Sequence, residues 1–137
     1  MGTLIDRRNI GSYLLKGWTR WLELPVILSD GNKCELIFSI KNLKHNRDLE
    51  LDMVAFQDRE LETDLQKVGV YVNDIFVTSL EMDKIARRYK VIIPHDLLKT
   101  DRLHLYFTVS DTRKFFNDTK WYDIGIDLVQ LTINYAK

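Results

Sequence analysis

The sequence predicts an all-β protein: an antiparallel, jelly-roll-like β-sandwich with about seven to eight strands and little helix. Two observations support this prediction. Apolar residues recur with a period of two in one segment after another, and turn-forming residues separate these segments at near-even spacing. The chain has 137 residues, of which 45% are hydrophobic and 29% are charged. These values are ordinary for one globular unit, so we expect residues 1–137 to form a single sandwich domain.

The expected strands begin after the turn-forming residues LSDGNK (28–33), where CELIFSI (34–40) has the pattern of an apolar strand. The next segment, LELDMVAF (49–56), first alternates apolar side chains with Glu50 and Asp52 and then becomes apolar on both faces. Such alternation places one face of a strand in a core and the other toward solvent.

A tight hairpin is expected near the middle of the chain. The alternating segments KVGVYVN (67–73) and IFVTSL (75–80) meet at Asn73-Asp74, and both residue types tolerate positive φ. A two-residue connection of this kind joins adjacent antiparallel strands.

Two more alternating segments follow, RYKVIIP (88–94) and LHLYFTV (103–109). The second places leucine, phenylalanine and valine on one face and His104, Tyr106 and Thr108 on the other. Between them, PHDLLK (94–99) is expected to form a short turn that carries two leucines into the core.

The last strand carries a signal of its own. In DIGIDLVQLTINY (123–135) the apolar positions change phase at Leu128-Val129. A slip of one residue would turn the following side chains to the wrong face, so we expect a β-bulge there. The remaining segments DRELETDLQK (58–67) and EMDKIARR (81–88) have too little apolar periodicity for a core helix and are expected to be loops.

Charge and composition exclude several classes of function. The 20 basic residues equal the 20 acidic ones, which argues against general nucleic-acid binding. No apolar run is long enough to insert into a membrane. The charged N-terminus lacks a secretory signal, so the chain is expected in the cytoplasm, or in the periplasm if it belongs to a larger protein. The single cysteine, Cys34, excludes an intramolecular disulfide and is expected to be an unreactive strand residue.

No catalytic or cofactor-binding motif is present. The glycine-rich nucleotide motifs, GxSxG and HExxH are all missing, and His45, His95 and His104 lie in separate segments. We therefore expect no enzyme activity, no catalytic residue, no metal site and no cofactor. Two alternatives stay open: a nucleophilic Cys34–His pair formed only in space, and a structural Ca²⁺ near the acidic segment DRELETD (58–64).

The candidate ligand-binding residues are aromatic side chains with polar neighbours. A flat aromatic ring buries the C–H groups of a sugar, and nearby polar groups hydrogen-bond its hydroxyls. The candidates for stacking are Trp18, Trp21, Trp121 and Tyr122, and those for hydrogen bonding are Asp111 and Arg113. The alternatives are that a tryptophan fills the core and that the Asp-x-Arg pair only braces its loop. In a strand, Trp18 and Trp21 would point to opposite faces.

The order of several short segments resembles a known family. The segments are GSYLLKGW (11–18), TRWLELPVILSDGNKCELIFSI (19–40), VGVYVNDIFV (68–77), YKVIIPHDLL (89–98) and SDTRKFFNDTKWYDIGIDLVQLTI (110–133). Together they are similar to a bacterial β-sandwich accessory module attached to glycosyltransferases and other surface-polysaccharide assembly proteins. The chain departs from the module where KFFNDTKWY (114–122) separates the Asp-x-Arg pair from the final strand. The resemblance implies a jelly-roll sandwich in a glycan-related context and no catalytic residues.

We expect a non-catalytic carbohydrate-recognition or accessory module in bacterial surface-polysaccharide (lipopolysaccharide or capsule) biosynthesis, with carbohydrate as its partner. The alternative is a structural module that binds other protein chains, including a second copy of itself. An open sheet edge can pair with another chain, and the mixed-polarity segment IFVTSL (75–80) is the expected edge.

Overall fold

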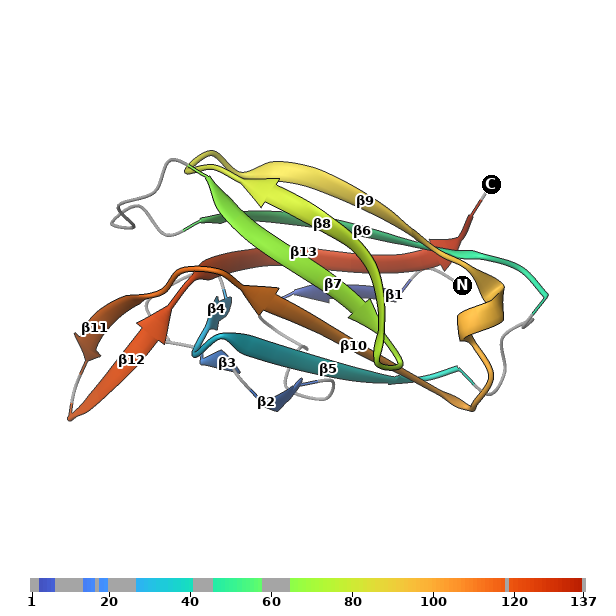
Figure 1. The fold of residues 1–137 in the computed structure, drawn as a ribbon, viewed down its shortest axis with the longest axis horizontal. Coiled ribbons are helices and arrows are strands. Elements are labelled where there is room, and N and C mark those ends of the chain that lie inside the picture. Colours follow the sequence, from blue (N-terminus) through green and yellow to red (C-terminus); the bar gives the residue numbers. More distant parts are fainter. Residues whose placement is uncertain are drawn as a thin grey trace.

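A computed structural model describes residues 3–6, 14–16, 18–19, 27–40, 46–57, 65–117 and 119–136. They form two antiparallel sheets that pack as a sandwich, and a two-stranded ribbon extends beyond one end (Figure 1). Helix in this part of the chain is limited to the 3-10 turn η2 (His95–Leu97). The prediction of an all-β antiparallel sandwich is therefore confirmed.

The first sheet, called sheet A, has a central long strand. Its order is β3 (Trp18–Thr19), β4 (Ile27–Ser29), β13 (Ile126–Tyr135), β6 (Leu49–Gln57) and β9 (Arg87–Ile93), and β1 (Thr3–Asp6) also pairs with β13. Sheet B has the order β2 (Leu14–Lys16), β5 (Lys33–Ser39), β10 (Arg102–Val109), β7 (Gln66–Val72) and β8 (Ile75–Met82). The ribbon consists of β11 (Arg113–Asn117) and β12 (Lys120–Ile124).

The number of strands exceeds the expected seven to eight, because the described residues contain thirteen. Strands β1 to β4 have only two to four residues each, which is too short for a period-two pattern to show in a sequence. The ribbon is a second difference: Arg113, expected in a loop with Asp111, is the first residue of a strand.

The core lies between the two sheets. Strand β6 alternates buried and half-buried residues along all nine positions, and its buried side chains meet those of sheet B. Phe107 and Leu105 from β10 are fully buried there. Leu98, from the turn after β9, is also buried, and Leu97 packs partly against the core, as the sequence predicted. Removal of this apolar surface from water is the main favourable contribution to folding.

The two special backbone features expected from the sequence are both present. Asn73 and Asp74 have φ values of 48° and 70°, so the β7–β8 hairpin turns through two left-handed residues. The pairing of β13 with β6 shifts register between Leu128 and Gln130, which is the predicted bulge. The bulge absorbs one residue, so that Leu128 and Leu131 are both buried.

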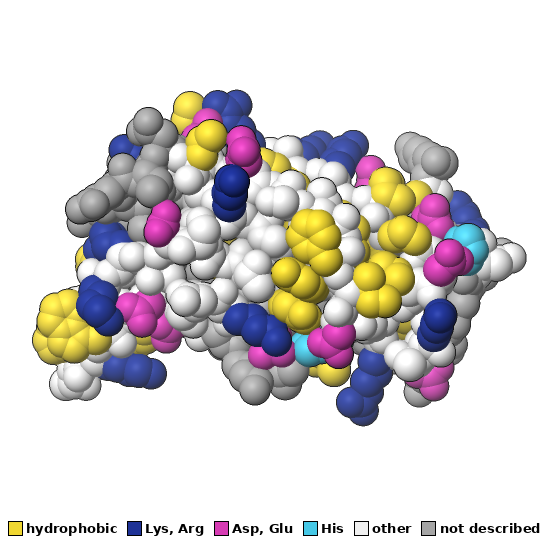
Figure 2. All heavy atoms as spheres, in the orientation of Figure 1, with side chains coloured by type: hydrophobic (Ala, Val, Ile, Leu, Met, Phe, Trp, Pro, Cys, Tyr) yellow, Lys and Arg dark blue, Asp and Glu magenta, His cyan; other side chains and the backbone are white. Residues whose placement is uncertain are grey.

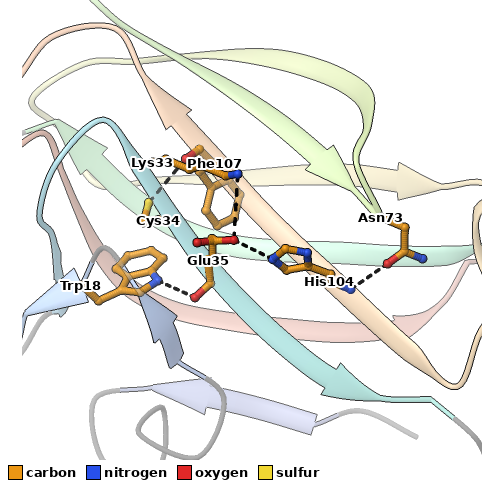
Figure 3. Close-up of polar contacts among 7 residues, drawn as sticks. All are labelled: Trp18, Lys33, Cys34, Glu35, Asn73, His104 and Phe107. Atoms are coloured by element: carbon orange, nitrogen blue, oxygen red, sulfur yellow. Dashed lines mark hydrogen bonds and ion pairs between the residues drawn. The ribbon is translucent and has the colours of Figure 1, made fainter.

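Cys34 is an inward-facing residue of β5. It is fully buried, and its thiol donates a hydrogen bond to the carbonyl oxygen of Phe107 at 3.7 Å. Burial, with a smaller contribution from the charge of Glu35, raises the pKa of the thiol far above its usual range. His104 reaches Glu35 on the outer side of sheet B, so Cys34 and His104 do not form a nucleophilic pair (Figure 3).

Two hydrogen bonds to the Asp48 carboxylate tie the turn after β9 to the turn before β6. Asp48 Oδ1 lies 2.8 Å from His95 Nδ1 and accepts a hydrogen bond from the His95 backbone N–H at 2.8 Å. The side-chain hydrogen bond raises the pKa of His95 and lowers the pKa of Asp48.

Within the described residues, no helix has the length and apolar character needed to cross a membrane.

Substitution of two neighbouring isoleucines of β9 tests which face of sheet A packs against the core. Ile93 is 0% exposed and Ile92 is 49% exposed. We expect Ile93→Ala to lower the free energy of unfolding by about 2–5 kcal/mol because it leaves a cavity. Ile92→Ala is the matched control and should change it by less than about 0.5 kcal/mol. Urea unfolding measures both, and equal losses would contradict the assigned faces.

The His95–Asp48 contact should make stability depend on pH. Its stabilisation is complete below 6.5, the ordinary pKa of histidine, and is lost as pH rises through the raised pKa of His95. At the acid end it is lost below 3.8, as pH falls through the lowered pKa of Asp48. Thermal unfolding should therefore show a larger destabilisation by Asp48→Asn near pH 5 than near pH 8.5. An equal effect at both pH values would contradict this contact.

Candidate functional site

The structure places Trp18 against the core. Its indole packs edge-on against Phe107, with ring centroids 6.3 Å apart and planes at 88°. The ring nitrogen donates a hydrogen bond to the backbone carbonyl of Glu35 at 3.0 Å (Figure 3). Both contacts are with sheet B, so Trp18 helps to hold β3 against it. Trp21 lies outside the described residues.

The ribbon presents two different faces. On one face Phe115 and Tyr122 pack against a small cluster that includes Leu28 and Ile124. Because side chains alternate along a strand, the next cross-strand pair, Phe116 and Trp121, points the other way.

Phe116 and Trp121 form the exposed aromatic pair of the ribbon. Their rings stack with centroids 5.1 Å apart and planes at 24°, and the residues are 50% and 63% exposed. In Figure 2 hydrophobic side chains stand out at the end of the molecule where β11 and β12 project. Of the sequence-predicted stacking residues that the structure describes, Trp121 is the most accessible.

Asp111 and Arg113 lie where sheet B passes into the ribbon. The buried side chain of Gln66 braces this junction: it donates to the Asp111 carbonyl at 2.5 Å and accepts from the Asp111 N–H at 2.9 Å. The Arg113 guanidinium lies 4.6 Å from the centroid of the Phe115 ring. The predicted residues are thus not gathered in one place, because Trp18 belongs to the sandwich and Trp121 to the ribbon.

A second aromatic surface, which the sequence analysis did not single out, crosses the outer face of sheet B. Tyr106 is paired with Tyr71, and Tyr71 is paired with Phe76, so the three residues form a row across β10, β7 and β8. We call these three residues the aromatic row. Figure 2 shows hydrophobic side chains gathered over these strands.

The rings of the aromatic row are packed against one another. Tyr71 and Tyr106 stack in parallel, with centroids 4.6 Å apart and planes at 6°. Phe76 meets Tyr71 edge-on at 5.4 Å and is 55% exposed. Gly69 makes room beside them: a Cβ at this position would lie 2.5 Å from Thr108 Oγ1 and 3.1 Å from the Tyr71 ring.

Charged groups border the Tyr106 end of the aromatic row. Glu35, the β5 residue paired with Tyr106, has a mostly buried carboxylate that lies 2.9 Å from His104 Nε2 and 4.0 Å from Lys33 Nζ. The Lys33 ammonium also lies 4.0 Å from the centre of the Tyr106 ring. The hydrogen-bond partners hold Glu35 and His104 in fixed positions beside the aromatic rings.

An open pocket of about 260 Å³ lies on sheet B, lined by Ile37, Phe38, Ser39 and Arg102. In the pairing of β5 with β10, Arg102 faces Ser39, His104 faces Ile37 and Tyr106 faces Glu35. The pocket and the aromatic row are therefore two ends of one surface on the outer face of sheet B.

The sequence contains a feature that points to this surface. Tyr71 and Tyr106 occupy the non-core phase of strands whose other phase is filled by valine, leucine and phenylalanine. An aromatic residue on the solvent phase of an interior strand is a recognisable feature. Only the register shows that the three rings of the row are adjacent, and the register is not readable from the sequence.

The outer face of sheet B combines apolar, hydroxyl and charged groups. No group of three or more His, Cys, Asp or Glu side chains in the described ranges is placed to hold a metal ion. The acidic segment 58–64, considered for Ca²⁺, lies outside these ranges. The arrangement on sheet B offers apolar ring surface, tyrosine hydroxyls and fixed charges, which suit reversible binding of a polar ligand with C–H faces.

Comparison with family models and with curated proteins finds no match for this chain. Among solved structures, the fold is similar to the CBM36-1 domain of a multidomain xylanase from the hindgut metagenome of Trinervitermes trinervoides. The TM-score is 0.61 at 12% sequence identity, covering 100% of this chain and 99% of that one. It is also similar to the carbohydrate-binding module CBM36 in complex with calcium and xylotriose, with a TM-score of 0.53 at 12% identity, over 98% and 99% of the two chains.

A third likeness is to a family GH115 4-O-methyl-α-glucuronidase, with a TM-score of 0.57 at 14% identity. It covers 82% of this chain but only 14% of that enzyme, so the similarity extends to one part of a much longer protein. At these identities the comparisons establish the fold alone: the chain has the β-sandwich architecture found in carbohydrate-binding modules.

Proposed function

We propose that this protein is a non-catalytic carbohydrate-recognition module that binds glycan on the outer face of sheet B. The observation that carries the proposal is the aromatic row, flanked by the hydrogen-bonded Glu35–His104 pair. The rings supply apolar contact for the faces of sugar rings, and the polar neighbours supply hydrogen bonds to hydroxyls. The shared architecture with the CBM36 modules supports this function, because those modules have the same layout and one of them holds xylotriose.

The biological setting that we propose follows from the sequence resemblance. The module would act in the cytoplasm beside glycosyltransferases of bacterial surface-polysaccharide biosynthesis, such as that of lipopolysaccharide or capsule. A recognition module in this setting would hold a growing chain near the enzyme that extends it, and would need no catalytic residues of its own.

A second candidate function is the pairing of sheet B with a second copy of this chain. Strand β8 is the last strand of sheet B, and among the strands that the structure describes it pairs only with β7. It exposes Ile75 and Phe76, which are 50% and 55% accessible. An exposed, partly apolar edge of eight residues is a template for pairing with another strand. This matches the edge expected from the sequence.

Two phenylalanines with almost equal exposure test where glycan binds. Phe76 belongs to the aromatic row and is 55% exposed, whereas Phe116 belongs to the ribbon and is 50% exposed. We expect Phe76→Ala to weaken binding about tenfold, which corresponds to about 1.4 kcal/mol of lost aromatic contact. Phe116→Ala should leave binding unchanged. The measurement is calorimetric titration with the tightest ligand found on an array of bacterial surface-polysaccharide fragments.

Each result of this experiment has a defined meaning. Binding of no fragment at millimolar concentration would contradict carbohydrate recognition itself. Loss of binding in Phe116→Ala with Phe76→Ala unaffected would move the site from sheet B to the ribbon. In that case the stacked pair Phe116–Trp121 would be the platform.

Light scattering after size-exclusion chromatography tests the edge-strand function. If β8 pairs with a second copy, the protein should elute as a dimer, and Ser79→Lys should convert it to a monomer. Ser79 is an exposed residue of β8, and a lysine on an edge strand opposes strand addition. Thr119→Lys, at an exposed turn position between β11 and β12, controls for the added positive charge. A monomer at every concentration would count against this function.

A further inference from the structure

The charged side chains on the outer face of sheet B differ in whether they contact other protein groups. The carboxylate of Glu35 is only 8% exposed and is shared between His104 and Lys33, at 2.9 Å and 4.0 Å. Lys33 also lies over the Tyr106 ring. The basic side chains near the aromatic row are therefore already in contact with protein groups.

Arg102 differs from Lys33 and His104. It is exposed, and within the described part of the chain its guanidinium has no ion-pair partner. It lines the pocket together with Ile37, Phe38 and Ser39. Its backbone is fixed by the exchange of two hydrogen bonds with the Thr100 hydroxyl, at 2.9 Å and 3.3 Å. The pocket thus combines an apolar wall, a hydroxyl and an available cation with five N–H donors.

The spacing between Arg102 and the aromatic row limits the size of the ligand. Arg102 and Tyr106 are four residues apart on the same strand, which corresponds to about 13 Å along an antiparallel strand. This distance is longer than a single sugar ring. A ligand that occupies both ends must be an oligosaccharide, with one unit at the pocket and another at the rings.

We propose that this surface selects an acidic glycan, in which the carboxylate of a uronic-acid-type sugar binds Arg102 at the pocket. A guanidinium pairs with a carboxylate through two parallel N–H···O hydrogen bonds, which fixes the orientation of the sugar as well as its charge. A neighbouring sugar unit contacts Tyr106, Tyr71 and Phe76. The inference rests on the proposed function and adds to it the chemical class of the ligand.

The test uses the smallest probe that carries the proposed group. Glucuronate is titrated into the 137-residue chain to tens of millimolar, a range that detects weak monosaccharide binding, while the Arg102 Nε–H signal is followed by NMR. We expect this signal to move with glucuronate and to stay in place with methyl glucoside at matched ionic strength. Arg102→Gln should weaken glucuronate binding at least tenfold. Lys90→Gln, which removes one positive charge at an exposed position of β9, should leave glucuronate binding unchanged.

The outcomes separate this inference from the proposed function. A response of the Arg102 signal that is equal for glucuronate and methyl glucoside would overturn the selection of acidic sugars, and so would the absence of any response. The same holds if Arg102→Gln binds glucuronate as tightly as the unaltered protein. The polysaccharide array tests carbohydrate recognition itself. Binding of neutral fragments through Phe76 would support the proposed function and contradict only the acidic ligand.

Discussion

The pairing of β10 with both of its neighbours is the constraint on which the rest of the structure depends. In one register it aligns Glu35, Tyr106 and Tyr71 across three strands, and the β7–β8 hairpin extends this alignment to Phe76. The same register turns Leu103, Leu105 and Phe107 into the core. A slip of one residue would exchange the two faces, so the core and the aromatic row are fixed together.

Polar side chains hold the loops to this frame. The Asn73 carboxamide accepts a hydrogen bond from the His104 N–H at 2.9 Å and donates one to the Leu97 carbonyl at 2.7 Å. It therefore ties the β7–β8 turn to β10 and to the segment after β9. At the other end of β7, Gln66 makes the equivalent connection to the start of the ribbon. Gln66 is the first residue of β7 and Asn73 follows its last residue, and backbone groups at such positions would otherwise lack partners.

The sequence supported the prediction of the fold better than that of the site. Alternation in β6, β7 and β10, the Asn73-Asp74 turn and the phase change at Leu128-Val129 are local signals, and each had its expected structural result. The short strands and the ribbon were missed because two to five residues carry no measurable period. The aromatic row was missed for a different reason: its members come from three segments, and only long-range pairing makes them neighbours. The tryptophans were candidates for sugar stacking because of their flat rings, yet Trp18 packs against Phe107.

Gly69 has a consequence for how this surface can change over evolutionary time. A side chain at this position would collide with Thr108 and with the ring of Tyr71. A replacement would therefore require the Thr108 hydroxyl to turn away and the Tyr71 ring to shift slightly. Homologues that keep the aromatic row should retain glycine at the position of Gly69 and tyrosine at the position of Tyr71. Homologues without the row can carry other residues at the position of Gly69. This pair of positions can serve as a signature for finding homologues that share the aromatic row.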